Sequence, residues 1–452
     1  MGYGKTKVAL KVLTLSTSFL FALTLIANPI LNDNYSTISG FLGQSNYITI
    51  EEEGGEEEDT IYHPTEYKSI AEQKANSKKL CEQVVGEGAV LLKNDNNALP
   101  IKTSADKKAK ISFFSASSID LAVTGGGSGA NNTRDKLDLK TTFEAENFEL
   151  NLDLWNWYNT NKATYGRQST SSIGVEYSIN DADWNELPAS KNNEADVAVF
   201  VLSRFGSESV DSRMNTGDPT DMTNGNYLEL SPTEISVIDN ISKNTGEGKT
   251  FKKFVILMNT TNQVECDFLE KYNIDACLWT GSLGSTGAAA IAKIFSGTIN
   301  PSGRLADAFW REHRLNPVYA NWGCFYYTLP DGTDSSTITQ ANMSSSSSPY
   351  TVYQEGIYNG YYYAETRYED KMFNKANVDD AGYRFNYYEA ISYPFGYGLS
   401  YTTFDYSDFK LVSYDALKDT YNFSIKVTNT GEVAGKDAVQ LYLQKPYTQY
   451  DV

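Results

Sequence analysis

The sequence has 452 residues, of which 40% are hydrophobic, enough for about three domains of ordinary size with buried cores. It carries 38 Lys and Arg against 57 Asp and Glu, a formal net charge of −19, and this sign argues against nucleic acid as a partner because it repels phosphate backbones. Its two histidines, His63 and His313, form no local metal motif, so we expect no metal and no cofactor, and acid–base chemistry falls largely on carboxylates.

The N-terminal segment predicts export. An uncharged, largely apolar run spans residues 12–32 and follows Lys5, Lys7 and Lys11. Roughly 20 apolar residues can cross a bilayer as a helix, so residues 1–34 are predicted to be a signal sequence or a membrane anchor. Residues 25–27 (LIA) are a poor cleavage site, which slightly favours an uncleaved helix in the membrane. The preceding lysines predict an extracytoplasmic chain, membrane-anchored or secreted.

An acidic segment follows. Residues 51–59 (EEEGGEEED) consist of carboxylates and two glycines, and like charges at this density repel one another and resist folding. We therefore interpret residues 35–66 as an extended acidic spacer without a binding role.

From residue 67 the sequence alternates between helical and strand patterns. A helical period over residues 69–85 ends at Gly86 and Gly88, and a helix start at Ser231 is marked by Pro232 and Glu234. A third helix is predicted over 287–295. The strand candidates are short continuous apolar runs, typical of strands buried on both faces, at 89–92, 110–114, 196–202, 254–258 and 276–279. This order predicts an α/β domain over 67–400, with a parallel sheet covered by helices on both faces.

The C-terminal segment, residues 401–452, has a different pattern. Strand-like alternation appears at 421–427 and 438–443, with a turn sequence at 429–431 between them. We therefore predict a partial antiparallel β-sandwich, too short to be self-sufficient.

Two loops are candidates for a functional site. The glycine loop at 124–129 (TGGGSG) lacks the spacing of a phosphate-binding motif, so a tight turn is the favoured interpretation. The second loop follows the run 196–202 and contains Arg204, Glu208 and Asp211. Ligands bind beyond the carboxyl ends of strands in open parallel sheets, so Glu208 could enter a cleft there. The alternative is an ordinary solvated loop.

Seven motifs in order resemble family 3 glycoside hydrolases of the β-glucosidase and β-xylosidase kind, and the last resembles the fibronectin III-like domain of that family. They are GAVLLKN (88–94) with ALP (98–100), GGGSG (125–129), YLELSP (227–232), NPSGRL (300–305), YQEGIY (353–358), PFGYGLSY (394–401), and VTNTG (427–431) with Gly435.

The resemblance implies a role for the second loop. The α/β region would be the family's α/β sandwich domain, which supplies the general acid/base to an active site shared with a (β/α)₈ barrel. Ser207–Glu208 matches the family's acid/base loop, with Ser209 where glycine is usual. Glu208 is accordingly the predicted catalytic residue, and Arg204 and Asp211 are predicted to bind substrate, a β-linked oligosaccharide or glycoside.

The barrel, which carries the nucleophile in this family, is missing from the predicted domains, since it needs about 250 residues. The order resembles a reversed arrangement interrupted within the fibronectin-like domain, so a barrel is expected in cis or in trans. Two alternatives remain open. The chain could be a non-catalytic carbohydrate-binding or partner domain, with tyrosines such as Tyr361 to Tyr363 as a stacking surface, or a truncated fragment.

Overall fold

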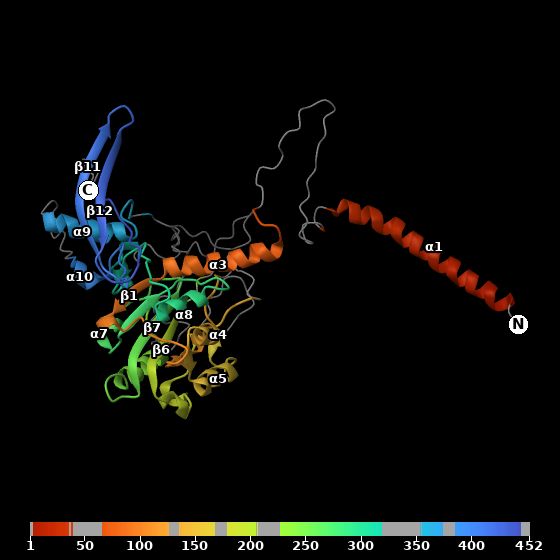
Figure 1. Cartoon of the computed structure of the whole chain (residues 1–452), viewed down its shortest axis with the longest axis horizontal. Helices are drawn as coiled ribbons and strands as arrows, with labels where there is room; N and C mark the ends of the chain where they lie inside the picture. Colours follow the sequence, from red (N-terminus) through yellow and green to blue (C-terminus); the bar gives the residue numbers. More distant parts are fainter. Residues whose placement is uncertain are drawn as a thin grey trace, which may run out of the picture. The chain divides into compact units, whose positions relative to one another are not determined.

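The computed structural model describes residues 3–35, 38, 66–125, 135–167, 179–204, 206, 227–318, 353, 355–373 and 385–443. The chain divides into two compact units, Met1–Ile70 and Ala71–Val452, and Figure 1 shows the elements of each.

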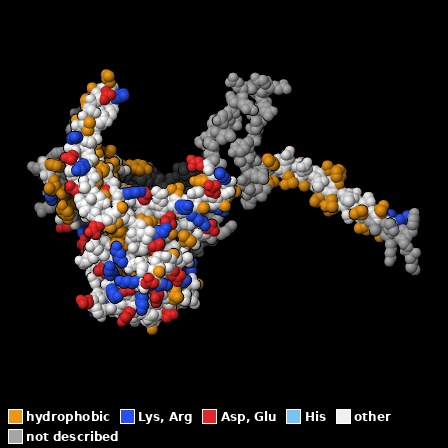
Figure 2. Space-filling view, in the orientation of Figure 1, with side chains coloured by type: hydrophobic (Ala, Val, Ile, Leu, Met, Phe, Trp, Pro, Cys, Tyr) orange, Lys and Arg blue, Asp and Glu red, His pale blue; other side chains and the backbone are white. Residues whose placement is uncertain are grey.

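The described part of the first unit is dominated by one long helix, α1 (Tyr3–Asp33), which contains Pro29. Its stretch Leu10–Asn32 has a mean hydropathy of 1.8 and is not buried by other residues. Figure 2 shows hydrophobic side chains distributed along the helix. Length and composition suffice for a membrane span, and a signal sequence would meet the same criteria. The helix agrees with the predicted apolar segment, and its role as signal or anchor stays a prediction.

A six-stranded sheet forms the centre of the second unit, in the order β1-β8-β7-β6-β2-β3. The strands are β1 (Val90–Asn94), β2 (Ala109–Phe114), β3 (Phe148–Leu150), β6 (Ala195–Arg204), β7 (Phe251–Thr260) and β8 (Ala276–Trp279). Five of them run parallel, whereas β1 pairs antiparallel with β8 at the edge. All five predicted apolar runs are strands. The antiparallel β1 departs from the prediction, because an apolar run indicates burial and not direction.

Helices cover both faces of this sheet, as predicted. One face packs against α3 (Ile70–Gly88), α4 (Leu139–Ala145) and α8 (Ala288–Ser296). The other packs against α5 (Leu152–Thr160), α6 (Pro232–Lys243) and α7 (Phe268–Lys271). Successive strand residues alternate between the faces, so Val199 and Leu257 belong to the first core and Phe200 and Ile256 to the second.

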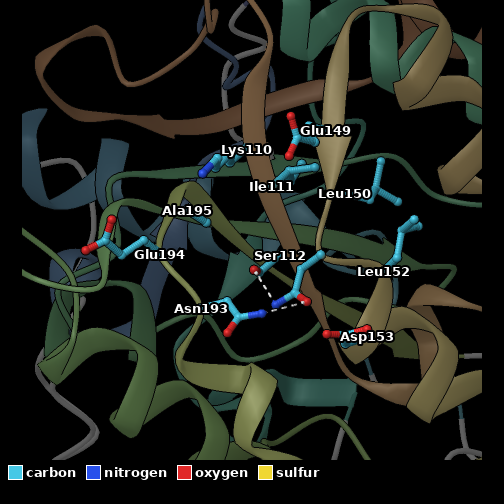
Figure 3. Close-up of a pocket in the computed structure, with 11 residues that line it drawn as sticks. Lys110, Ile111, Ser112, Glu149, Leu150, Leu152, Asp153, Asn193, Glu194 and Ala195 are labelled. Atoms are coloured by element: carbon cyan, nitrogen blue, oxygen red, sulfur yellow. Dashed lines mark hydrogen bonds between the residues drawn. The ribbon is translucent and has the colours of Figure 1, made fainter.

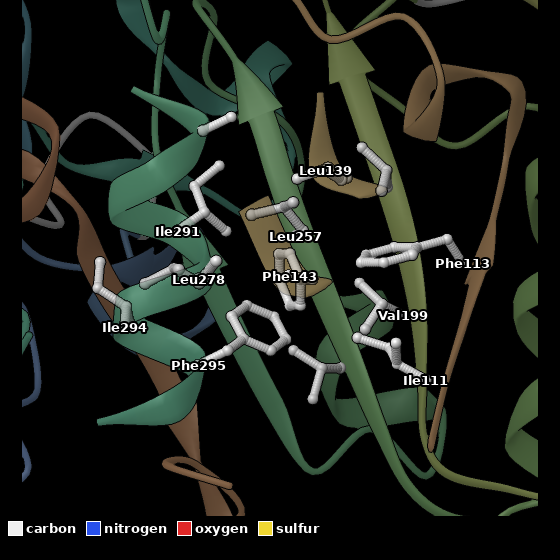
Figure 4. Packing of buried hydrophobic residues seen from close by; sticks show 14 of the residues in the cluster. Ile111, Phe113, Leu139, Phe143, Val199, Leu257, Leu278, Ile291, Ile294 and Phe295 are labelled. Atoms are coloured by element: carbon white, nitrogen blue, oxygen red, sulfur yellow. The ribbon is translucent and has the colours of Figure 1, made fainter. Parts of the chain in front are cut away.

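The first core is anchored by an aromatic cluster (Figure 4). The ring of Phe143, from α4, lies 5.0 Å from Phe113 and 5.1 Å from both Phe148 and Phe295, measured between centroids. The pairs with Phe113 and Phe295 are edge-on, and such pairs add favourable energy beyond the buried area. The cluster packs α4 and α8 against the strands β2 and β3.

One of two predicted helix boundaries agrees with the structure. At α6 the predicted capping box is present: Ser231 Oγ accepts from Glu234 N, and Glu234 Oε2 accepts from Ser231 N. At α3 the helix continues to Gly88, past the predicted end. Glycine costs a helix only about 1 kcal/mol, and Gly86 is buried where a Cβ atom would lie 3.2 Å from Ile299. Close packing therefore outweighs the conformational preference of glycine there.

A smaller cluster follows the main sheet. The two-residue strand β9 (Phe309–Trp310) pairs with β10 (Ile391–Tyr393), and helices α9 (Tyr361–Phe373) and α10 (Tyr387–Ala390) pack beside them. Part of the tyrosine-dense segment is thus helical. The minor elements are β4 (Gly166–Arg167) paired with β5 (Ile179–Asn180), and the 3₁₀ turns Asp95–Asn97, Ala116–Ser118, Trp184–Glu186, Ala189–Asn192 and His313–Leu315.

The C-terminal segment contains a two-stranded antiparallel ribbon, β11 (Phe404–Asp415) and β12 (Thr420–Asn429). Antiparallel β structure is confirmed, but the predicted pairing is wrong. β12 pairs with the strand that precedes it, and residues 438–443 are not in a strand. Alternation alone does not identify the partner of a strand.

Three of the sequence motifs meet at glycines. Gly303 N donates to Ala89 O at 3.1 Å, and a Cβ atom on Gly303 would lie 2.5 Å from the same oxygen and closer still to Gly88 O. A Cβ atom on Gly398 would collide with Gly303 O. Only glycine permits these backbone approaches, which join the start of β1 to the segments before β9 and before β11.

Replacing Gly303 should therefore be costly. We expect Gly303→Ala to lower the free energy of unfolding by about 3 kcal/mol, because backbone must move to admit the methyl group. Gly88→Ala is the matched control, since no atom lies within 4 Å of a Cβ atom there. Urea denaturation of the full chain measures both. Equal losses in the two variants would show that the backbone contact is unimportant.

Candidate functional site

The carboxyl ends of the parallel strands define one edge of the sheet. β2, β6, β7 and β8 end at Phe114, Arg204, Thr260 and Trp279, and the segments that follow all leave this edge. Ligands of open α/β sheets bind at this edge, and the described residues at the starts of the two predicted loops, Thr124 and Gly125 and Gly206, come after strands that end there.

Buried polar side chains hold the loops of this edge together. Asn259, fully buried near the end of β7, accepts from Ala122 N at 2.6 Å and donates to Ala122 O and Gly281 O at 2.9 and 2.7 Å. Trp279 Nε1 donates to Thr260 O at 3.1 Å. Buried and fully bonded amides of this kind fix loop positions, because breaking them leaves unpaired polar groups.

The two predicted loops begin side by side. A Cβ atom on Gly125, the first glycine of the glycine loop, would lie 3.5 Å from Gly206 O, two residues before Glu208. Glu208 and Asp211 lie outside the described residues, as does the glycine loop beyond Gly125. Their predicted roles stay predictions, and the described residues locate the points at which their segments start.

Arg204, the last residue of β6, is the described member of the predicted site. Its side chain is 2% exposed, and all five guanidinium N–H donors have protein acceptors. Nε donates to Tyr227 O at 2.6 Å. Nη1 donates to Ser203 O at 2.9 Å and to Glu234 Oε1 at 2.7 Å. Nη2 donates to Glu229 O at 2.6 Å and to Glu234 Oε2 at 2.8 Å. None is left for a sugar hydroxyl, so the structure gives Arg204 a different task from the predicted substrate contact.

Glu234 completes a buried, bidentate ion pair with Arg204. Burial lowers the pKa of Arg204, but the adjacent carboxylate of Glu234 raises it by more, so that it lies above its usual value. Sequence reasoning identified Glu234 as a helix cap and missed this second role. The pair joins residues 30 positions apart, and a Glu at the start of a helix is common enough that only the fold reveals its partner.

A second buried carboxyl, Asp181, was also missed. Its side chain is 3% exposed, and Oδ1 accepts from Ala116 N at 3.1 Å and from Ala182 N at 2.9 Å. Within the described part of the chain Oδ2 has no partner. Burial raises the pKa of Asp181 to about 6, the charge of Glu234 contributing in the same direction. Asp181 thus lies beside the same edge as a carboxyl that is costly to ionise.

The tyrosines proposed as a stacking surface pack against one another. Tyr361 stacks on Phe395 with 4.0 Å between ring centroids and on Tyr362 with 4.4 Å. Tyr363 packs edge-on against Phe385. These contacts occupy the faces of Tyr361, and a sugar ring would need to displace one of its neighbours.

A pocket of about 570 Å³ lies on the opposite edge of the sheet (Figure 3), at the amino ends of β2 and β6. Two of its polar groups bond to each other, since Asn151 Nδ2 donates to Ser112 Oγ at 3.2 Å, and the same nitrogen donates to Ser190 O, outside the pocket lining, at 2.7 Å. None of the predicted site residues lines it. In the described ranges there is also no cluster of three or more His, Cys, Asp or Glu side chains that could hold a metal ion.

Comparison with known proteins gives a consistent result. Residues 89–361 match the family model described as "Glycosyl hydrolase family 3 C-terminal domain". Beta-glucosidase A of Butyrivibrio fibrisolvens is 28% identical over 392 residues, covering 80% of this chain and 40% of that protein. The periplasmic beta-glucosidase of Salmonella typhimurium is 33% identical over 176 residues, covering 39% and 17%.

A solved structure shows the same arrangement. Beta-glucosidase 3B of Thermotoga neapolitana, in complex with glucose, has a TM-score of 0.59 and 26% identity, covering 80% of this chain and 43% of that one. The chain therefore spans about two fifths of the length of the relatives that it matches over most of its own length.

The raised pKa of Asp181 predicts a pH-dependent stability. Its folded pKa of about 6 lies above the ordinary value of 3.8, so its stabilising contribution is complete only below about pH 3 and is lost as the pH rises through 6. Between pH 4 and 7.5, Asp181→Asn should gain about 2 kcal/mol in free energy of unfolding relative to the parent. Urea denaturation across this range provides the test, with the exposed Asp106→Asn as control. The same difference at both pH values would contradict the assignment.

Proposed function

Because the chain belongs to family 3 of the glycosyl hydrolases, we propose that it is the part of a β-glucosidase-like enzyme that supplies the general acid/base, with Glu208 in that role. The observation that supports this most is the position of Glu208 in the sequence: it follows β6, whose end lies on the carboxyl edge of the sheet, within the region that matches the family. The substrate would be a β-linked glycoside or oligosaccharide, and Asp211 is proposed to contact it.

The proposed chemistry needs two carboxyl groups. Glu208 would protonate the leaving glycosidic oxygen and then, as a base, activate water against the glycosyl-enzyme. A retaining mechanism requires a second carboxylate about 5–5.5 Å away as the nucleophile. We propose that a (β/α)₈ barrel, joined in cis or binding in trans, provides it, and that the described α/β domain without a barrel has little turnover.

The proposed location is outside the cytoplasm, membrane-anchored or secreted. Helix α1 is long and apolar enough for either route, and the lysines before it favour an N-terminus on the cytoplasmic side. The name of the periplasmic relative agrees with export.

The acid/base assignment is testable through the leaving group. The full chain is assayed with a family 3 barrel domain on phenyl β-glucoside, whose leaving group needs protonation, and on 2,4-dinitrophenyl β-glucoside, whose leaving group does not. We expect Glu208→Gln to lower kcat/KM about 100-fold or more on the first substrate and little on the second. Glu194→Gln, an exposed carboxyl at the amino end of β6, is the control.

Three results would contradict the proposal. Equal losses on both substrates would remove Glu208 from the acid role. No hydrolysis in the presence of the barrel would contradict the glycosidase assignment. Rapid hydrolysis by the chain without the barrel, abolished in Glu208→Gln, would contradict the need for a second domain.

A further inference from the structure

We propose that Arg204 is the positioning residue of the acid/base segment: its guanidinium fastens both ends of residues 205–226 to one buried carboxylate, that of Glu234. This inference rests on the proposed function of Glu208 and adds to it a structural cause for where the acid is held.

The incoming end of the segment is fixed by the sheet. Ser203 and Arg204 pair with Asn259 and Thr260 in the parallel register of β6 and β7, and Arg204 O accepts from Thr261 N at 3.2 Å. The backbone of Arg204 is therefore held by the buried carboxyl end of the neighbouring strand β7. Glu208 follows four residues later, so its backbone lies at most about 14 Å from this fixed point.

The outgoing end is held by the side chain of the same arginine. Its guanidinium donates to the carbonyl oxygens of Tyr227 and Glu229 and lies 5.5 Å from the centre of the Tyr227 ring. Leu228 O accepts from Glu265 N at 2.9 Å, which ties the same stretch to the segment after β7. The chain thus returns to the point that it left, and one side chain bonds both ends.

Glu234 fixes the orientation of the Arg204 guanidinium, and we call these contacts of Arg204 and Glu234 the junction. Its two carboxylate oxygens receive the two Nη groups side by side, a planar arrangement that arginine makes and lysine cannot. Oε2 also accepts from Ser231 N, so the start of α6 is part of the same network. A buried ion pair of this kind adds little net stability compared with apolar packing. The pair instead restricts the geometry, because its bidentate contacts allow only one arrangement of the two ends.

The consequence concerns catalysis. A general acid must lie within hydrogen-bond reach of the leaving oxygen, and an error of about 1 Å in a catalytic group can cost 100-fold in rate. Loosening the junction should therefore impair the protonation of poor leaving groups before it impairs any step that needs no acid.

The test uses the ratio of kcat/KM on phenyl β-glucoside to that on 2,4-dinitrophenyl β-glucoside, measured for the full chain with the barrel domain. The ratio is independent of the folded fraction, so a loss of stability alone leaves it unchanged. Arg204→Lys keeps the positive charge but loses the two side-by-side Nη groups that bind Glu234. We expect it to lower the ratio at least tenfold, while kcat/KM on the dinitrophenyl substrate stays within about threefold of the parent.

Two further variants strengthen the test. The double variant Arg204→Met with Glu234→Leu removes both charges together, so that neither is left buried without its partner, and it should lower the ratio similarly. Arg311→Lys is the matched control, because Arg311 also binds a carboxylate through two N–H groups, that of Glu270 at 2.7 and 3.0 Å. It should leave the ratio unchanged.

A measurement without turnover completes the design. Hydrogen exchange of the peptide 227–234 in the full chain alone should become faster in Arg204→Lys and remain at the parent rate in Arg311→Lys. An unchanged exchange rate or an unchanged ratio in Arg204→Lys, with the ratio lowered in Glu208→Gln, would overturn the positioning role and leave the proposed function intact. An unchanged ratio in Glu208→Gln would overturn both.

Discussion

A guanidinium that is 2% exposed must find an acceptor for each of its N–H groups, and this constraint shapes the candidate site. Arg204 meets it with Glu234 and three backbone carbonyls. To place those acceptors together, the chain must leave β6 and return before α6 at one point. Both ends of the segment that carries the proposed acid/base are therefore held at the sheet by buried polar contacts. Removing one member of the ion pair alone would leave a buried charge unpaired, at a cost of several kcal/mol.

Several residues of the sequence motifs have a similar role, because each holds together segments that are distant in sequence. Gly303 and Gly398 permit backbone contacts that no side chain would allow, and they bring two later segments of the chain to the start of β1. Asn259 performs a similar task at the carboxyl edge with hydrogen bonds. These motif and framework residues support the fold, and chemistry is proposed for only a few positions on the segment that they hold.

The sequence predicted the strands of the sheet well, but it predicted strand pairing and the buried polar contacts between distant segments poorly. Both outcomes have physical reasons. The continuous apolar runs correctly located five strands, because a strand buried on both faces consists mainly of apolar residues. Ser231 and Glu234 correctly located the start of α6. Strand direction at β1 and the partner of β12 were missed, since both depend on contacts distant in sequence. Arg204 was predicted to bind substrate because it lies in the loop that leaves the carboxyl end of a predicted strand, and its buried partner Glu234 is distant in sequence. Asp181 carried no local signal.

The central claim is that Glu208, on the segment that follows β6, protonates the leaving group of a glycoside. It is tested most directly by the pH dependence of kcat/KM for the full chain with a barrel domain on a substrate with a poor leaving group. The account predicts a bell-shaped profile whose alkaline limb disappears in Glu208→Gln, because that limb reports the loss of the acid's proton. An alkaline limb that persists unchanged in the variant would contradict it.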